Sequence, residues 1–558
     1  MAKDYSKLEK DGLLKIIEKL ESRKKYGLIW DEEKTKERFE RESENALPVL
    51  KEVKGKEIKT DTSKPTNILI EGDNYHALSV LSYTHQGKID VIYIDPPYNT
   101  GKKDFKYNDV WVDENDTYRH SKWLSFLNKR LRLVKSLLKD KGVVFISIDD
   151  TEIAQLRLLC NEIFGEENFI NNFMWLHGKG KKTKQSRTLQ QYILCYGKNK
   201  NLLGEWVDVK FATGTFSNPD NDKRGDWFSG SVSFSEDRSN KQHDNYFTIK
   251  SPSGVKWTRQ WQCTEDEMNE YLDNGKIYFG PAPEYSNVPR LKIFPTDSNE
   301  IIPNNILDNV GTTRGAQKEL DQMIGKNDDG KSKFENPKPP KLIEFFCNIV
   351  NAGKDIVVLD FFAGSGTTGH AVLNLNKIDT GNRTFLLCTN DEEIDRNGDN
   401  KKHKICSDIC YPRIQKAIEG YKIPRGVKIE GLGGNLKYFK TSVVKISVGR
   451  DDMKIRITRE CTEMLCLREG IFEEKKKKTG YRIFEQNGRV MAVYYALERD
   501  GLEQLKKEMD KMKSEKVLYC FTLDPLGLDK EDFAEWNNVN LEPIPQKILD
   551  IYEQIYEY

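Results

Sequence analysis

The sequence predicts an α/β fold with a mostly parallel, doubly wound sheet, an inserted domain and a small α+β domain towards the C-terminal end. Short apolar runs rich in β-branched residues alternate with longer amphipathic segments, as in β–α–β units. Two of these runs, Val91–Ile94 and Val357–Leu359, stop at an aspartate followed by a Pro-rich or Gly-rich turn. In open α/β sheets, ligands bind at this carboxyl edge of the strands.

The periodicity of apolar residues places the individual elements. The expected strands are 67–70, 90–94, 142–148, 168–175, 191–196, 357–359 and 384–391. The expected helices are 74–83, 121–138, 342–350 and 370–375. The helix over 121–138 has an apolar stripe on one face and Lys and Arg on the other, which predicts packing against the sheet.

The strand Val91–Ile94 ends at Asp95-Pro96-Pro97-Tyr98. Proline fixes φ and has no N–H, so this segment is stiff. The Asp95 carboxylate and the Pro96 carbonyl can each accept one N–H of an exocyclic amino group, and Tyr98 can stack on a flat ring. The alternative is a strand that ends in a tight turn, with Asp95 capping the following segment. Asp95, Pro96, Pro97 and Tyr98 are therefore the candidate catalytic residues.

The second motif runs from Asp360 to Gly369 and contains Gly-x-Gly-x-x-Gly. Glycines let a backbone approach a ligand closely, and the helix that follows offers free N–H groups at its N-terminus. In a dinucleotide-binding protein this turn would hold pyrophosphate. The preceding Asp-Phe-Phe-Ala is unusual for a phosphate site. The glycine pattern alone is weak evidence for a ligand-binding turn. It becomes strong evidence in a chain that also carries Asp-Pro-Pro-Tyr at another strand end.

Together these motifs resemble those of amino-methyltransferases that act on DNA bases. Their order, with the catalytic motif first, is similar to that of the β class, a circularly permuted form of the Rossmann-like S-adenosylmethionine-dependent methyltransferase fold. Further stretches resemble the modification (Mod) subunit of type III restriction–modification systems. These stretches are Glu71–Leu78, Asn99–Gly101 with Phe105, His120–Leu124, Phe145–Asp150 and Thr213–Asn221. The resemblance covers roughly residues 65–425.

The resemblance implies transfer of a methyl group from S-adenosyl-L-methionine to adenine N6 in double-stranded DNA, after the base has left the stack. The implied cofactor-binding residues are Asp73, Asp360, Phe362, Ala363, Gly364, Ser365, Gly366, Thr367 and Asn390. Asp73 has a simpler alternative role as a helix N-cap. By the same family resemblance alone, Asp rather than Ser before Pro-Pro-Tyr favours adenine over cytosine N4. We also expect a homodimer, and a separate restriction (helicase–nuclease) subunit is a further possible partner.

The chain divides into five expected parts. They are an N-terminal helical arm (1–64), the catalytic half of the methyltransferase domain (65–199), a target-recognition domain (200–335), the cofactor-binding half (336–430) and an α+β domain (431–558) for dimerisation or docking. The region 200–335 is rich in Gly, Asn, Asp, Ser and Trp and resembles the target-recognition domain of the family. Its Arg and Asn side chains can read base edges, while its aromatic residues are equally compatible with a plain core.

A basic stretch, 177–187, lies between two expected strands and is predicted to be a flexible loop. Its candidate DNA-binding residues are Lys179, Lys181, Lys182, Lys184 and Arg187. Lys and Arg side chains in such a loop can contact phosphates. The alternative is a solvated loop, which is the usual reading of a charge run.

The composition narrows the class of protein. The chain has 558 residues, of which 37% are hydrophobic and 32% charged, with a net charge of +1. No apolar run reaches the roughly 18 residues of a membrane span, and the N-terminus lacks the apolar core of a signal peptide, so we expect a cytoplasmic protein. Local basic stripes suffice for DNA binding. His403-x-x-Cys406-x-x-x-Cys410 lacks a convincing fourth ligand, so we expect no metal site.

Several alternative functions can be compared with the sequence. A solitary DNA methyltransferase and a cytosine-N4 methyltransferase would share both motifs. A methyltransferase for RNA or for protein glutamine would fit neither the large insertion nor the permuted order. A non-catalytic DNA-recognition module would need a degenerate site, whereas both motifs are intact. The chain contains no Pro-Cys pair, which argues against methylation of cytosine C5. DNA cleavage would require a separate restriction subunit.

Overall fold

The computed structural model describes residues 28–31, 35, 37, 46–61, 63–102, 104–182, 184–211, 215–350, 352–394, 403–423, 426–445, 450–524, 527–529, 531 and 533–556. The apolar pattern that predicted an N-terminal helical arm lies within residues 1–27, outside this part of the chain. The chain forms two compact units: residues 205–303 with 348–351, and the remainder. Each unit is described by itself.

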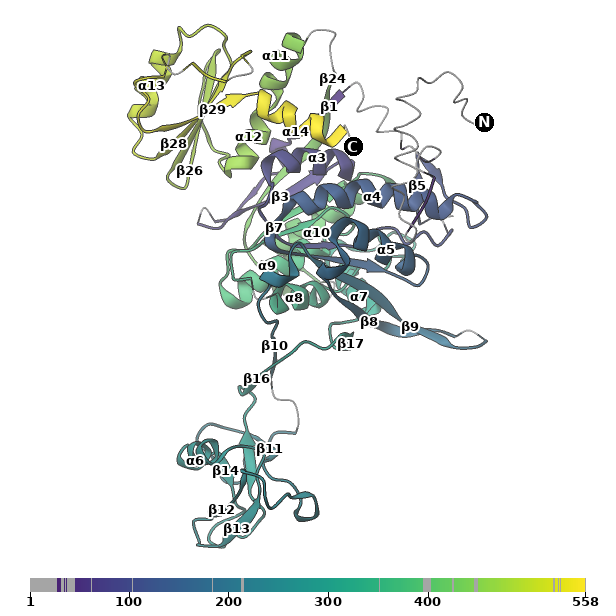
Figure 1. Ribbon diagram of the computed structural model, residues 1–558, viewed down its shortest axis with the longest axis vertical. Helices are drawn as coiled ribbons and strands as arrows, with labels where there is room; N and C mark the ends of the chain where they lie inside the picture. Colours follow the sequence, from purple (N-terminus) through teal and green to yellow (C-terminus); the bar gives the residue numbers. More distant parts are fainter. Residues whose placement is uncertain are drawn as a thin grey trace, which may run out of the picture. The chain divides into compact units, whose positions relative to one another are not determined.

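An eleven-stranded sheet forms the centre of the larger unit, with the order β1–β24–β3–β19–β18–β4–β7–β9–β8–β17 and β2 paired with β24 (Figure 1). Its strands are β1 (Ala46–Glu52), β2 (Ile58–Lys59), β3 (Thr66–Glu71), β4 (Ile89–Ile94), β7 (Leu138–Ile148), β8 (Phe169–Lys182), β9 (Arg187–Gly197), β17 (Ile306–Leu307), β18 (Val357–Asp360), β19 (Thr384–Thr389) and β24 (Asn435–Lys445). The neighbours from β24 to β7 are all parallel, which confirms the predicted mostly parallel sheet.

The strand β18, from the expected cofactor half, pairs directly with β4, from the expected catalytic half. Val358 lies opposite Val91, and Leu359 lies opposite Ile92. Since both strands run in the same direction, their carboxyl ends reach the same edge of the sheet. The two motifs are thus brought together by backbone pairing between distant segments, as the permuted arrangement requires.

Helices cover both faces of the sheet. α3 (Asn74–Thr84), α4 (Arg119–Leu137) and α5 (Ile153–Phe164) share a buried apolar cluster with Ile92 and Ile94. Tyr93 points the other way, because side chains alternate along a strand, and its ring lies 6.3 Å from that of Phe346 in α8 (Pro340–Ile349). α9 (Thr367–Asp379), α10 (Tyr411–Glu419) and α7 (Thr313–Ile324) complete the helices around the sheet. This is the predicted doubly wound arrangement.

The C-terminal part contains a second, five-stranded sheet, β25–β26–β27–β28–β29. Its elements are α11 (Arg450–Glu460), α12 (Thr462–Glu469), β25 (Glu474–Lys477), β26 (Tyr481–Gln486), β27 (Arg489–Tyr494), α13 (Leu502–Asp510), β28 (Glu515–Phe521), β29 (Val539–Ile544) and α14 (Gln546–Tyr556). The boundary differs from the predicted 431, because β24 pairs with β3 in the central sheet. β1 likewise pairs with β24, although it falls in the predicted helical arm.

In the smaller unit, residues 205–303, the described residues form short antiparallel strands and one α-helix. They are β10 (Asp208–Phe211), β11 (Phe228–Ser231), β12 (Tyr246–Lys250), β13 (Lys256–Gln260), α6 (Glu265–Asp273), β14 (Ile277–Tyr278), β15 (Arg290–Ile293) and β16 (Ser298–Ile301). Trp261 is fully buried in its core. The predicted domain boundary of 335 lies too late, since β17 pairs with β8 in the central sheet.

Three two-stranded ribbons complete the strands: β5 (Lys106–Tyr107) with β6 (Val110–Trp111), β20 (Glu393–Ile394) with β21 (His403–Lys404), and β22 (Gly420–Lys422) with β23 (Lys428–Glu430). Within the described residues, no helix combines the length and the apolar character needed to cross a lipid bilayer.

Phe346 fills the space between α8 and the sheet, and its ring lies 4.3 Å from that of Phe145. Its side chain is fully buried. We expect Phe346→Ala to lower the free energy of unfolding by about 3–5 kcal/mol, because it leaves a cavity in a packed aromatic cluster. Denaturant titration measures this loss. Ile378→Ala, at an exposed position of α9, is the control, and an equally small effect of both changes would contradict the prediction.

Candidate functional site at the carboxyl edge of the sheet

Polar residues follow four adjacent parallel strands at one edge of the central sheet. β3 precedes Asp73, β19 precedes Asn390, β18 ends at Asp360, and β4 precedes Asp95. The order of the strands, β3–β19–β18–β4, therefore places residues from both halves of the chain along the same edge. This is the edge at which open α/β sheets bind ligands.

The Asp95 carboxylate is held by two donors. Its Oδ1 accepts a hydrogen bond of 2.8 Å from the Tyr98 hydroxyl and one of 2.6 Å from Nζ of Lys338. Lys338 Nζ also lies 2.9 Å from the Tyr98 oxygen. Burial raises the pKa of Tyr98 well above its ordinary value, so its hydroxyl stays protonated and donates the hydrogen bond to Asp95. The three side chains form a closed polar cluster.

Lys338 was not singled out from the sequence. It lies in the segment Asn336-Pro337-Lys338-Pro339-Pro340 just before α8. Prolines on both sides mark a stiff turn, but they do not say what a lysine between them contacts. Its partner Asp95 is far away in the sequence, so only the folded chain reveals the pair.

The backbone after Asp95 is fixed from the side of α4 and α5. The Trp123 indole donates to the Pro97 carbonyl at 2.7 Å. Asn99 adopts a left-handed conformation (φ 59°) and is fully buried. Its amide donates to Glu152 at 2.6 Å, and Glu152 also contacts Nδ1 of His120 at 2.6 Å. Burial raises the pKa of Glu152. These contacts hold the Asp-Pro-Pro-Tyr turn in one conformation.

The Gly-rich turn is equally constrained. Gly364 (φ 49°) and Gly366 (φ 78°) have left-handed backbones, a conformation that favours glycine. A Cβ at Gly366 would lie 3.0 Å from the Cys410 sulfur. Asp360 is buried and accepts hydrogen bonds from the Phe362 amide (3.0 Å) and the Thr368 hydroxyl (2.5 Å).

A buried arginine supports this turn from α10. Arg413 donates to the Ser365 hydroxyl at 3.0 Å and to the Thr367 hydroxyl at 2.7 Å. Its burial lowers the pKa of the guanidinium to about 10. The sequence offered no sign of this role, because Arg413 is one of many basic residues in a helical pattern. Thr367 in turn donates to the Lys338 carbonyl at 3.1 Å, which links the Gly-rich turn to the segment before α8.

The remaining predicted cofactor residues lie at the same edge. Asp73 is the N-cap of α3, accepting from the Tyr75 amide at 2.8 Å, and its other oxygen lies 3.6 Å from Arg130. The alternative role as a helix cap is therefore observed, and the cofactor contact stays a prediction. Asn390 follows β19 directly, and its neighbour Asp391 accepts hydrogen bonds from Ser407.

Residues 177–182 of the basic stretch belong to a strand, so the prediction of a loop was wrong for this part. β8 continues to Lys182 and β9 begins at Arg187, with Lys181 opposite Thr188. Ladder hydrogen bonds come from the backbone, so a polar, Gly-containing composition did not prevent pairing. Lys184 and Arg187 are exposed. The side chains of Lys179, Lys181 and Lys182 lie outside the described part.

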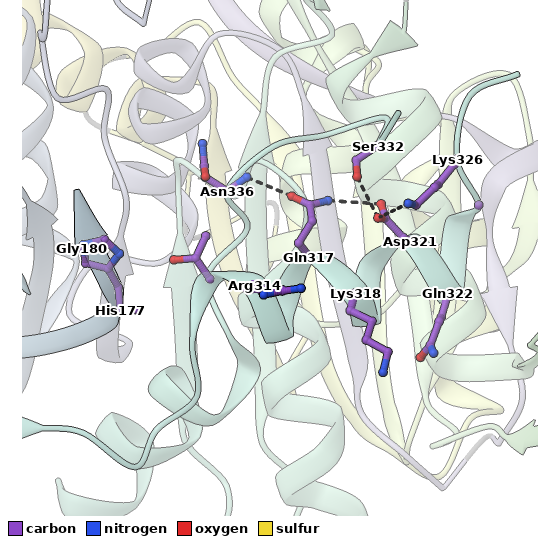
Figure 2. A pocket seen from close by; sticks show the side chains of 13 residues that line it. His177, Gly180, Arg314, Gln317, Lys318, Asp321, Gln322, Lys326, Ser332 and Asn336 are labelled. Carbon is purple, nitrogen blue, oxygen red and sulfur yellow. Dashed lines mark hydrogen bonds and ion pairs between the residues drawn. The ribbon is translucent and has the colours of Figure 1, made fainter. Parts of the chain in front are cut away.

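A pocket of about 950 Å³, lined by polar residues, lies between β8 and α7 (Figure 2). His177 and Gly180 line one side, and side chains of α7 line the other. Asp321 in this pocket contacts Gln317, Ser332 and Lys326. Arg314 and Lys318 line it too and form no ion pair with any described residue, which leaves local positive charge.

The segment from Gly325 to Ser332, beside the same pocket, has the spacing Gly-x-x-x-x-Gly-Lys-Ser of a P-loop. It follows the helix α7 rather than a strand. Its backbone forms a tight turn, in which the Asn327 amide donates to the Lys331 carbonyl at 2.9 Å. A P-loop joins a strand to a helix, so this match is one of spacing alone. Among the residues that the structure describes, no three His, Cys, Asp or Glu side chains gather as a metal site.

Burial raises the pKa of Asp360 to about 7, from an ordinary value of 3.8. Between these pH values the folded chain holds a proton that the unfolded chain has lost, so this group lowers stability as pH rises through the window. We expect the melting temperature of Asp360→Asn, relative to that of the parent, to increase from pH 4.5 to pH 8. The corresponding change in the free energy of unfolding is at most roughly 4 kcal/mol. A difference that does not change with pH would contradict this prediction.

Comparison with known proteins shows which family this chain resembles. A family model described as DNA methylase matches residues 89–394. The chain is 34% identical over 382 residues to the Mod subunit of the type III restriction–modification enzyme StyLTI of Salmonella typhimurium, covering 63% of this chain and 56% of that protein. It is 30% identical to the EcoP15I Mod subunit of Escherichia coli, covering 74% of this chain and 73% of that protein. It is 31% identical to the EcoPI Mod subunit of Escherichia phage P1, covering 73% and 71%.

The chain thus spans a little over half of the length of the StyLTI subunit and more than two thirds of the other two. The resemblance seen in the sequence and the predicted fold are both confirmed. The chain belongs to the DNA methylases, together with the Mod subunits of type III restriction–modification enzymes.

Proposed function

We propose that this protein methylates N6 of adenine in duplex DNA, with S-adenosylmethionine as the methyl donor, as the modification subunit of a type III restriction–modification system. The observation that carries the proposal is the placement of Asp95, Pro96 and Tyr98 at the end of β4, beside the Gly-rich turn that follows β18. This edge offers two acceptors and an aromatic ring next to a glycine turn.

The residues at β18 fit the cofactor. Left-handed Gly364 and Gly366 carry no side chain that would keep a ligand from the backbone. The turn runs into the N-terminus of α9, whose first amides are free of partners within the helix. When bound, S-adenosylmethionine supplies an electrophilic methyl group. The residues proposed to hold it are Asp73, Asp360, Phe362, Ala363, Gly364, Ser365, Gly366, Thr367 and Asn390.

At the catalytic turn, the flipped adenine stacks on Tyr98 while Asp95 and the Pro96 carbonyl accept the two N6 hydrogens. This orientation turns the nitrogen lone pair towards the methyl donor. The carboxylate also stabilises the positive charge that grows on N6. Pro96 and Pro97 keep the acceptors in place before the base arrives, so little reorganisation is needed when the reaction occurs.

DNA contact is proposed for two basic surfaces of the larger unit. Lys184 and Arg187 lie on the exposed ribbon, with Lys179, Lys181 and Lys182 beside them in sequence. Arg314 and Lys318 line the polar pocket next to the segment that carries Lys338. The unit 205–303 is proposed to read the target sequence. A homodimer and a separate restriction subunit are the proposed partners, with the five-stranded C-terminal sheet as a docking region.

Cytosine N4 remains the second candidate target, because the same acceptors and the same stacked ring suit any exocyclic amino group on a flat base. The methylated product itself distinguishes the two reactions.

Single-molecule sequencing of DNA from cells that express the protein tests the proposed reaction. We expect N6-methyladenine at one short motif, and a rate about 10²–10³-fold lower for Asp95→Ala, which removes a charge-stabilising acceptor. Asp140→Asn, an exposed change, should leave methylation intact. N4-methylcytosine would move the target to cytosine, and DNA binding without modification would favour a recognition module.

Salt dependence of DNA binding tests the basic ribbon. If Lys184 and Arg187 contact phosphates, the double change Lys184→Gln with Arg187→Gln lowers the magnitude of the slope of log K against log salt by about 1.8, at roughly 0.9 per contact. Affinity for S-adenosylmethionine should not change. The matched control is Lys475→Gln with Lys477→Gln on β25. An unaltered slope in the Lys184 and Arg187 variant would contradict phosphate contact and favour the alternative of a solvated loop.

A further inference from the structure

We propose that Lys338 is a positioning residue that fixes the Asp95 carboxylate so that only one of its oxygens, Oδ2, faces the target amino group. The inference rests on the proposed function and deepens it. Lys338 is not part of the Asp-Pro-Pro-Tyr motif and reaches Asp95 from the cofactor half of the chain.

The two hydrogen bonds to Asp95 both fall on Oδ1, from Tyr98 and from Lys338. Within the described part of the chain, Oδ2 has no such partner. An exocyclic amino group has two hydrogens and needs two acceptors. These contacts leave Oδ2 and the Pro96 carbonyl open as acceptors. Oδ1 of the carboxylate therefore has a structural role, and Oδ2 binds the substrate.

Rotation of the carboxylate would destroy this division. The terminal torsion of an aspartate is broad and roughly two-fold, so a single hydrogen bond restrains it weakly. Tyr98 and Lys338 donate to the same oxygen and also contact each other at 2.9 Å. Two linked donors on Oδ1 fix the plane of the carboxylate more firmly than Tyr98 alone.

Lys338 cannot easily leave this position. Its side chain is only 8% exposed, and a buried ammonium without a partner is costly. Nζ also lies 5.2 Å from the centre of the Tyr98 ring and 5.8 Å from that of Trp175. The backbone is held as well, because Pro337 and Pro339 flank the residue and Thr367 donates to its carbonyl at 3.1 Å.

The position of the cation has a chemical consequence. One buried positive charge compensates the carboxylate before the base binds, while Oδ2 stays open to accept from N6. The ammonium also reaches the Tyr98 oxygen, so it restrains the ring on which the base stacks. The same side chain therefore orients both the acceptor and the stacking surface.

Steady-state methylation of a DNA duplex tests the proposal with Lys338→Met, which keeps an unbranched side chain one atom shorter and removes its charge. We expect kcat to fall about 10²-fold, the scale at which misplacement of a catalytic group acts. KM for DNA and Kd for S-adenosylmethionine should change less than about threefold, since kcat reports the orientation. Lys341→Met, an exposed change on α8, is the control.

Chemical rescue separates positioning from a general loss of structure. Ethylammonium should restore part of the kcat of Lys338→Ala by filling the space of the missing ammonium, and it should not rescue Asp95→Ala. Circular dichroism checks that each variant is folded. If Lys338→Met methylates within twofold of the parent, the inference is overturned. It is also overturned if Kd for S-adenosylmethionine rises as much as kcat falls, since Lys338 would then serve the cofactor.

The parent enzyme distinguishes this inference from the proposed function. If the parent methylates DNA and the Lys338 variants behave like it, only the role of Lys338 is wrong. If the parent does not methylate DNA at all, the proposed function itself has failed.

Discussion

The pairing of β18 with β4 is the constraint on which the site depends. These strands come from segments that are far apart in the chain, and their ladder places Asp360 and Asp95 at the same edge of the sheet. Between them the chain adds β7, β9 and β8 on one side of β4 before it returns to β18. Residues 205–303, which form most of the smaller unit, are inserted in this part of the chain. A separate unit can therefore be inserted without interrupting the strands that form the site.

Buried polar groups concentrate around this edge, and each is held by a partner from another element. Asp360 is held by Thr368, and Arg413 donates to Ser365 and Thr367. A buried charge is costly unless it is paired and hydrogen-bonded. The raised pKa of Asp360 and the lowered pKa of Arg413 reflect this cost. Groups with perturbed pKa values that gather at one site are typical of functional sites.

The sequence predicted those parts of the fold that depend on local pattern. Apolar periodicity located the central strands and helices, and the strand ends led to Asp95 and Asp360. It did not predict Lys338 or Arg413 as parts of the site, because a lysine or arginine gives no local sign of a partner in another element of the fold. Residues 177–182 were predicted to be part of a loop, because the ladder that pairs them with β9 is formed by backbone groups. The end of the inserted domain was placed too late, because polar composition does not reveal that β17 pairs with β8.

The Asp-Pro-Pro-Tyr turn is supported from two directions that belong to different halves of the chain. Glu152 binds Asn99 just after Tyr98, and both residues belong to the catalytic half. Lys338 binds Asp95 from the segment before α8, in the cofactor half. The first contact fixes the backbone of the turn, and the second fixes the orientation of its carboxylate. An isolated catalytic half would therefore carry the complete Asp-Pro-Pro-Tyr motif, but its carboxylate would keep only the hydrogen bond from Tyr98. The permuted order thus separates the motif from the residue that orients it, and only the assembled sheet unites them.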